Sequence, residues 1–194
     1  MKEKRTAGSK NVTSGLLIIY LVVLTWIILF KMEFNLKLLL GMNLRSINLI
    51  PFAGSAIVNG KAEVSEIVSN IAVFIPFGMY LSMLYRTKSA RTEGACVRGC
   101  PEGIPCRTTG FLMKVLPIFA VSLMYEVLQY CFAIGASDIT DLLGNTFGGI
   151  IGIGLFAVCS KIMGERTVKI LNILAAAGTV IVVAFLALLV VANM

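Results

Sequence analysis

FLMKVLPIFAVSLMYEVLQYCFAI, GASDITD and LLGNTFGGIIGIGLFAVCSKIM follow one another over residues 111–163, and this stretch decides the fold. Its apolar parts, Phe111–Ile134 and Leu142–Met163, are each long enough for an α-helix to cross the hydrocarbon core of a bilayer, which takes about 20 residues. A short polar turn joins them. The stretch therefore predicts two consecutive transmembrane helices.

Three further apolar segments flank this pair: Leu16–Phe30, Val68–Tyr85 and Val168–Val191. The chain of 194 residues is 58% hydrophobic and 14% charged, and its mean hydropathy of +0.91 is outside the range of a soluble domain. We predict an all-α fold, a polytopic membrane helix bundle of about five transmembrane helices with a re-entrant or amphipathic segment after the first. A single domain, residues 1–194, accounts for this length, with residues 1–34 as the first span and residues 164–194 as a final scaffold span.

The first apolar segment follows a basic tail, a combination that is also typical of secretory signal peptides. No small-residue cleavage site follows the segment, so we expect it to be a retained span. Residues 35–67 are mixed in polarity, and we expect them to form a re-entrant or surface loop. Pro76 lies inside the second apolar segment, which predicts a kink and a freed carbonyl that a neighbouring helix must satisfy.

Lys and Arg residues indicate the orientation, because they favour the cytoplasmic ends of membrane spans. With the N-terminus inside, twelve of them fall on cytoplasmic segments, and four fall on external ones: Lys31, Lys37, Arg45 and Lys61. We predict a multi-pass protein with a cytoplasmic N-terminus and an external C-terminus. This distribution explains the net charge of +7 without a nucleic-acid partner.

The sequence contains no His, which excludes Ser-His triads and His-containing zinc sites. Cys96, Cys100 and Cys106 form no CxxC pair and lack a fourth ligand for tetrahedral zinc. We interpret the loop that holds them as a variable surface loop, and we expect neither a metal nor another cofactor.

Glu126 lies well inside the Phe111–Ile134 segment, where an ionised side chain costs about 3 kcal/mol or more unless it is protonated, paired or facing water. Ser122 and Gln129 lie about one helical turn to either side of it, on the same face. We predict that this polar stripe faces the bundle interior.

Other polar residues fall near the same, external ends of the spans. Asp138, Asp141 and Asn145 have the spacing i, i+3 and i+7, so they share a face if their helix begins near Ser137. The candidate site is therefore the following set: Arg45, Asn48, Asn70, Glu126, Gln129, Asp138, Asp141 and Asn145.

Two interpretations of this set are open. In the first, the side chains line a polar pocket, with Arg45 available for a phosphate or carboxylate and the acids for a cation, sugar or amine. In the second, they are helix contacts and caps, because Asn and Gln commonly bond across membrane helices and Asp138 or Asp141 can cap a helix. The ridge of Gly144, Gly148 and Gly152 predicts close backbone packing.

Four motifs in register resemble the VanZ-like family of bacterial membrane proteins: RSINLIPF at 45–52, NIAVFIPFG at 70–78, EVLQ at 126–129 and DITDLLGNTFG at 138–148. The resemblance covers about residues 43–155, and the family's recurrent polar positions map onto the candidate set. Many relatives carry an Arg shortly before the first Asp of the turn, where this chain has Gly135-Ala136-Ser137. The resemblance implies a protein of the bacterial cytoplasmic membrane that contributes to resistance against teicoplanin-type glycopeptide antibiotics.

Three functions are compatible with these residues. The first is a non-enzymatic accessory protein that contacts membrane lipids and binds an amphiphile, either a lipid-linked cell-wall precursor or a lipoglycopeptide, at the outer leaflet. The second is an enzyme acting on a lipid-linked head group through Glu126 and Asp138 or Asp141, although no nucleophile–base pair or metal motif supports it. The third is a proton-coupled flippase with Glu126 as proton carrier, although no inverted repeat is visible. We expect the first.

Overall fold

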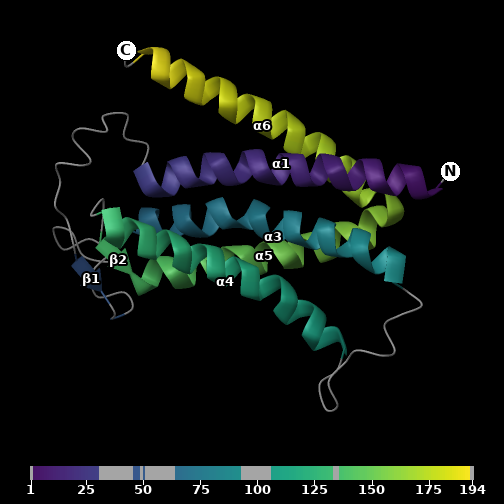
Figure 1. The fold of residues 1–194 in the computed structure, drawn as a ribbon, viewed down its shortest axis with the longest axis horizontal. Helices are drawn as coiled ribbons and strands as arrows, with labels where there is room; N and C mark the ends of the chain where they lie inside the picture. The colour runs from purple at the N-terminus through teal and green to yellow at the C-terminus, as the bar shows by residue number, and fades with distance from the viewer. Residues whose placement is uncertain are drawn as a thin grey trace.

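The structure, a computed structural model, describes residues 2–30, 46–48, 50, 64–92, 106–132 and 136–192. Within these ranges the chain forms five long helices: α1 (Lys2–Phe30), α3 (Val64–Thr92), α4 (Cys106–Phe132), α5 (Ile139–Met163) and α6 (Thr167–Ala192). A short 3-10 turn, Gly164–Arg166, joins α5 to α6. Consecutive helices run in alternating directions along one bundle (Figure 1).

Four stretches of the described residues are long and apolar enough to cross a membrane: Ser9–Leu29, Ile67–Arg86, Gly110–Phe132 and Ile139–Leu188. The last stretch contains both α5 and α6, of 25 and 26 residues. Each of these helices is long enough for a crossing of its own at about 1.5 Å per residue. The predicted all-α membrane bundle with about five helices is confirmed.

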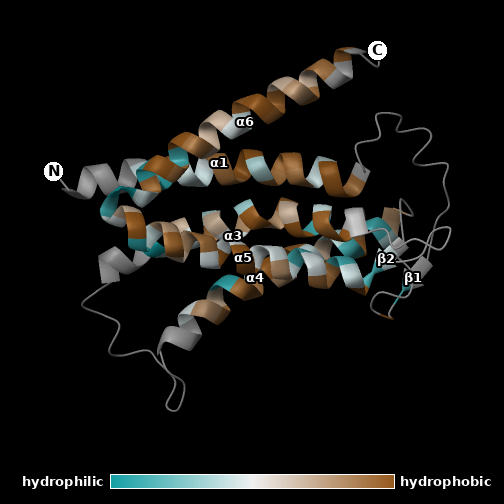
Figure 2. Cartoon of the chain, turned by 180° about the vertical axis from the view of Figure 1, so that it is seen from behind, coloured by the Kyte–Doolittle hydropathy of each residue, from teal (hydrophilic) through white to brown (hydrophobic). Residues whose placement is uncertain are grey.

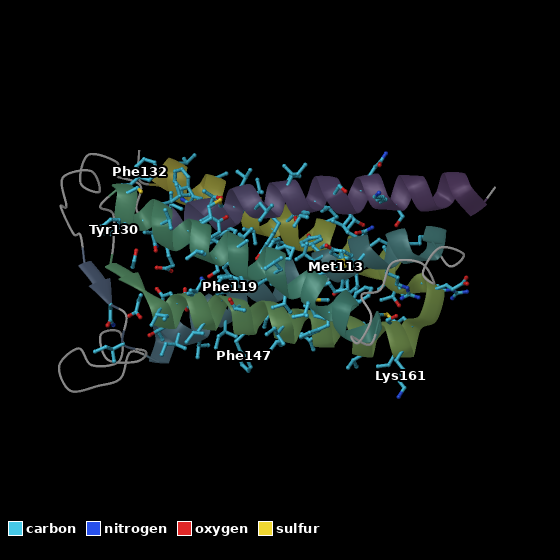
Figure 3. The ribbon with its side chains drawn as sticks, turned by 60° about the horizontal axis from the view of Figure 1, so that its bottom comes forward. Met113, Phe119, Tyr130, Phe132, Phe147 and Lys161 are labelled. Carbon is cyan, nitrogen blue, oxygen red and sulfur yellow. The ribbon has the colours of Figure 1, made fainter. Side chains whose placement is uncertain are left out.

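Polarity follows the long axis of the bundle. Figure 2 shows hydrophobic residues along every long helix and hydrophilic ones near β2 and at the turn between α5 and α6. Large side chains such as Phe132 and Phe147 project away from the helices and are about half exposed, at 51% and 55% (Figure 3). Such an apolar outer surface suits contact with lipid chains.

The two ends of the bundle differ in which segments they hold. The N-terminus and the α5–α6 turn lie at one end, whereas the C-terminus, β1 and β2 lie at the other (Figure 1). The N-terminus and the C-terminus thus lie at opposite ends of the bundle, as the predicted orientation requires. The side of the membrane that each end faces stays a prediction.

A short pair of strands closes the second end. β1 (Ser46–Asn48) and β2 (Ala136–Asp138) pair in parallel, with Asn48 opposite Asp138. The sequence prediction missed this pair, because strands of three residues carry no alternation to read. The predicted loop over residues 35–67 falls largely outside the described residues.

Glycines bring α3 and α5 into backbone contact. A Cβ added to Gly148 would lie 2.1 Å from the carbonyl oxygen of Ile71, and one added to Gly152 would lie 2.0 Å from that of Ile75. Both are far shorter than a van der Waals contact, so only glycine allows this approach. The predicted close packing is confirmed at Gly148 and Gly152, whereas a Cβ on Gly144 would make ordinary contact at 3.8 Å and one on Gly154 would meet nothing within 4 Å.

Side-chain hydrogen bonds attach α1 to α3 and to α6. Tyr20 donates a hydrogen bond to the carbonyl oxygen of Val73, in the turn before Pro76 of α3. This carbonyl lies three residues before Pro76, whereas the carbonyl that the proline frees is that of Ala72, four residues before it. The predicted contact to the freed carbonyl therefore stays a prediction. In the N-terminal half of α1, Thr13 Oγ1 donates to Asn172 Oδ1 of α6 at 3.0 Å. Beyond this contact α6 diverges from α1 (Figure 1).

Candidate functional site

The polar stripe of α4 faces the bundle interior, as predicted. Ser122, Glu126 and Gln129 are buried, with exposed fractions of 0%, 7% and 5%. They share one helix face because they are spaced three and four residues apart. The face therefore turns its polar groups toward α1 and α5 instead of toward lipid.

Glu126 holds the turn that precedes α5. Its Oε2 accepts a hydrogen bond of 3.1 Å from the backbone amide of Asp138, and its backbone carbonyl accepts one of 2.7 Å from Ser137 Oγ. A buried backbone amide needs such a partner, and a carboxylate is the stronger kind of acceptor. The sequence analysis did not select Ser137, although a hydroxyl next to a turn aspartate is a common backbone-bonding residue.

Asp138 is the N-cap of α5. Its backbone is extended, with φ −120° and ψ 126°, and its Oδ1 accepts a 2.7 Å hydrogen bond from the amide of Thr140. The shared face of Asp138, Asp141 and Asn145 required a helix that begins near Ser137, whereas the helix begins at Ile139. Asp138 therefore has the capping role that the second interpretation gave it. An aspartate at this position ends the extended segment by satisfying an amide of the first helical turn.

Asn48 completes a network of three chain segments. Its Nδ2 donates to Asp138 Oδ2 at 3.0 Å, while its Oδ1 accepts from the amide of Ile50 at 3.2 Å. β1, the α4 stripe and the N-cap of α5 therefore meet at Asp138. Asp138 and Glu126 are both only 7% exposed.

Asn70 and Asp141 form a second contact beside this network. Asn70 Nδ2 of α3 donates to Asp141 Oδ1, in the first turn of α5, at 2.6 Å. The carboxylate also suits the positive end of the helix dipole. We call Asn48, Asn70, Glu126, Asp138 and Asp141 the end cluster.

The two remaining amides of the candidate set make separate helix contacts. Asn145 Nδ2 donates to Ser122 Oγ at 3.1 Å, linking α5 to α4. Gln129 Nε2 donates to the carbonyl oxygen of Ile28 at 3.0 Å, linking α4 to α1. For these two residues the interpretation as helix contacts fits the geometry, although within the described part of the chain neither side-chain oxygen has a hydrogen-bond partner.

Arg45 lies outside the described residues. A cavity of about 550 Å³ lies among α1, α3 and α6, and none of the candidate residues lines it. Over the same residues, no group of three or more acidic or Cys side chains could hold a metal ion together. The end cluster is thus a set of hydrogen-bonded acids and amides at one end of the bundle.

The contact between Asn70 and Asp141 can be measured by a double-mutant cycle. We expect Asn70→Ala and Asp141→Ala to show a coupling of about 1 kcal/mol in the free energy of unfolding, because the hydrogen bond is charge-assisted and such bonds between membrane helices reach about 1.7 kcal/mol. The measurement is denaturant unfolding of the purified protein in detergent micelles. A control cycle of Asn70→Ala with Thr13→Ala, which lie on different contacts, should be additive, and additivity in the first cycle would show that the bond contributes nothing.

Comparison with known proteins gives two matches. A family model described as VanZ/LLP1 matches residues 17–160 of this chain. Protein VanZ of Enterococcus faecium is 33% identical over 157 residues, which cover 81% of each chain. No solved structure matches.

Proposed function

This chain belongs to the VanZ/LLP1 family, and from that premise we propose that it is a non-enzymatic accessory protein of the bacterial cytoplasmic membrane. In this proposal the end cluster binds the head group of an amphiphile at the outer leaflet. The amphiphile is a lipid-linked cell-wall precursor or a teicoplanin-type lipoglycopeptide. The protein then contributes to antibiotic resistance by occupying or shielding that molecule.

The observation that carries the proposal is the way in which Asp138 is held. Two other segments of the chain contact it, through Asn48 at 3.0 Å and Glu126 at 3.1 Å, and its own side chain accepts from the amide of Thr140 at 2.7 Å. Groups that are fixed in this way by their neighbours are pre-organised for recognition. Carboxylates accept hydrogen bonds from hydroxyl and amino groups, which are abundant in sugar and peptide head groups.

The position of the end cluster supports an external site. It lies at the end of the bundle opposite the N-terminus and the α5–α6 turn (Figure 1). The excess of Lys and Arg belongs to the N-terminal tail, residues 86–107 and residues 161–169, which the charge rule assigns to the cytoplasm. With this orientation the cluster is at the depth where a head group meets the outer ends of the helices.

The hydrogen bonds of the two buried acids favour binding over turnover. Glu126 accepts from the amide of Asp138, and Asp138 accepts from the amide of Thr140. In both cases the acid serves as an acceptor that fixes the start of α5. A general acid must instead carry a proton that it can release to the substrate.

A susceptibility assay tests the proposal. Expression of the chain in a teicoplanin-sensitive Gram-positive host should raise the inhibitory concentration of teicoplanin. Asp138→Asn should return it to the value of the empty vector, because the variant keeps a cap acceptor and the side-chain volume but loses the charge. The control is Asn172→Ser, far from the end cluster, at equal protein abundance.

Two outcomes would contradict the proposal. One is resistance that Asp138→Asn leaves unchanged, which would remove the end cluster from the function. The other is conversion of an envelope lipid by the purified protein, which would make the chain an enzyme.

A further inference from the structure

The cavity among α1, α3 and α6 is separate from the end cluster. Its volume is about 550 Å³, and its walls include Leu24 and Ile27 of α1, Pro76 and Met83 of α3, and Leu174 and Gly178 of α6. It lies between helices that are long and apolar enough to cross a membrane. Its surroundings are therefore lipid chains and not water.

The side chains that line the cavity are mostly apolar. Three lining residues carry hydroxyl groups, namely Tyr20, Tyr80 and Thr179. Tyr20 donates to the carbonyl oxygen of Val73, and Thr179 donates to that of Ala175 at 2.8 Å. With two of the three hydroxyls already bonded within the protein, the cavity does not supply the two to four polar partners that a buried water needs.

The dimensions of the cavity suit one hydrocarbon chain. It extends from Ala72 to Met83 along α3 and from Leu171 to Val182 along α6, which is about 16 Å at the rise of an α-helix. That length is roughly half of the 30 Å hydrocarbon core, or the depth of one leaflet.

The cavity opens sideways toward the bilayer. Asn172 attaches α6 to α1 at one end, and α6 then diverges from α1 toward its C-terminus (Figure 1). Two lining residues on this part of α6, Leu174 and Val182, are 61% and 40% exposed. The opening is thus at membrane depth, between α1 and α6.

We propose that this cavity holds one acyl chain of a bilayer phospholipid, which enters between α1 and α6. An unfilled cavity of this size forfeits the dispersion contacts of its walls, and the acyl chains of the bilayer are the groups that stand at its opening. The bound chain fills the space that the divergence of α6 leaves. This inference does not depend on the head-group proposal, because no residue of the end cluster lines the cavity.

Photolabelling tests the inference. The full chain is reconstituted in phosphatidylcholine vesicles that contain a diazirine on the lipid acyl chain, and labelled residues are mapped by mass spectrometry. Labels on Tyr80 and Met83 report a chain inside the cavity, because both line it and are only 5% and 2% exposed. Labels on Leu174 report ordinary lipid contact.

Gly178 allows the cavity to be filled without a clash at Cβ. A Cβ there would meet nothing within 4 Å, so Gly178→Phe places its ring in the space. We expect labelling of Tyr80 and Met83 to fall about tenfold, which is the change produced by losing the burial of about two methylene groups. Gly154→Phe on α5 is the matched control, since its Cβ also meets nothing within 4 Å and it does not line the cavity. It should leave the labelling unchanged.

A second variant, Ala175→Leu, fills the same cavity with a smaller group. It should also lower the labelling of Tyr80 and Met83, and it serves as the test if Gly178→Phe fails to accumulate. Absence of labels from Tyr80 and Met83 in the unmodified chain would overturn the inference. So would equal labelling of these residues in the unmodified chain and in a folded Gly178→Phe variant. Cross-linking of the cavity residues to a second copy of the chain would assign the cavity to a helix and not to a lipid.

Discussion

Gly148→Ala is expected to destabilise the bundle by about 3 kcal/mol, the upper part of the range for overpacked sites. The added Cβ would lie 2.1 Å from the carbonyl oxygen of Ile71, which belongs to the backbone of α3. No side chain can rotate away to relieve this contact, so α3 and α5 must separate. Their separation would also loosen the neighbouring approach of Gly152 to Ile75, where the same distance is 2.0 Å.

The measurement is thermal unfolding of the purified protein in detergent, where we expect the midpoint to fall by about 10 °C for a chain of this length. Gly154→Ala is the matched control on the same helix. Because its Cβ meets nothing within 4 Å, the higher helix propensity of Ala should leave stability unchanged or slightly raised. Equal midpoints for the two variants would show that α3 and α5 are not in backbone contact.

Two replacements of Glu126, by Ala and by Gln, should distinguish its contribution to folding from its contribution to function. Glu126→Ala removes the acceptor for the buried amide of Asp138, and an unsatisfied buried donor costs about 1–3 kcal/mol. We expect this variant to lose both protein abundance and teicoplanin resistance. Glu126→Gln keeps one oxygen for the amide, while its other oxygen becomes an NH2 donor and the carboxylate is lost, so it should accumulate closer to the level of the unmodified chain than Glu126→Ala and still lose resistance.

The readouts are membrane abundance by immunoblot and growth in teicoplanin, measured on the same cultures. Gln129→Ala is a useful comparison, because Gln129 lies on the same face but bonds to Ile28 of α1 and not to the end cluster. It should lower abundance and resistance together. Full resistance in Glu126→Gln would mean that the charge of Glu126 has no part in the function.

The helices could be predicted from the sequence because membrane spans are read from length and hydropathy. The segment Leu142–Met163 and the helix Ile139–Met163 differ by one turn at the start and agree at the end. The inward stripe of Glu126 could also be predicted, because helical periodicity fixes which residues share a face. The close packing of Gly148 and Gly152 could be predicted too, because the same periodicity places them on one face of their helix.

The contacts within the end cluster could be predicted only in part. Spacing put Asp138 on the helix face of Asp141 only for a helix that begins near Ser137, whereas Asp138 caps a helix that begins at Ile139. The pairing of Asn48 with Asp138 joins strands that are far apart in the chain, and no local pattern encodes such a pairing. The cavity was not predicted either, because it depends on the angle at which α6 leaves α1.

Binding of a head group to the end cluster is tested most directly with the purified chain in lipid nanodiscs. Fluorescent teicoplanin and a fluorescent lipid-linked cell-wall precursor are titrated separately against the unmodified chain and Asp138→Asn. We predict saturable binding of at least one of them to the unmodified chain and an affinity about tenfold lower for the variant, the loss expected for a hydrogen bond to a charged group. Equal affinity for the two proteins, or no binding of either probe above empty nanodiscs, would contradict the account.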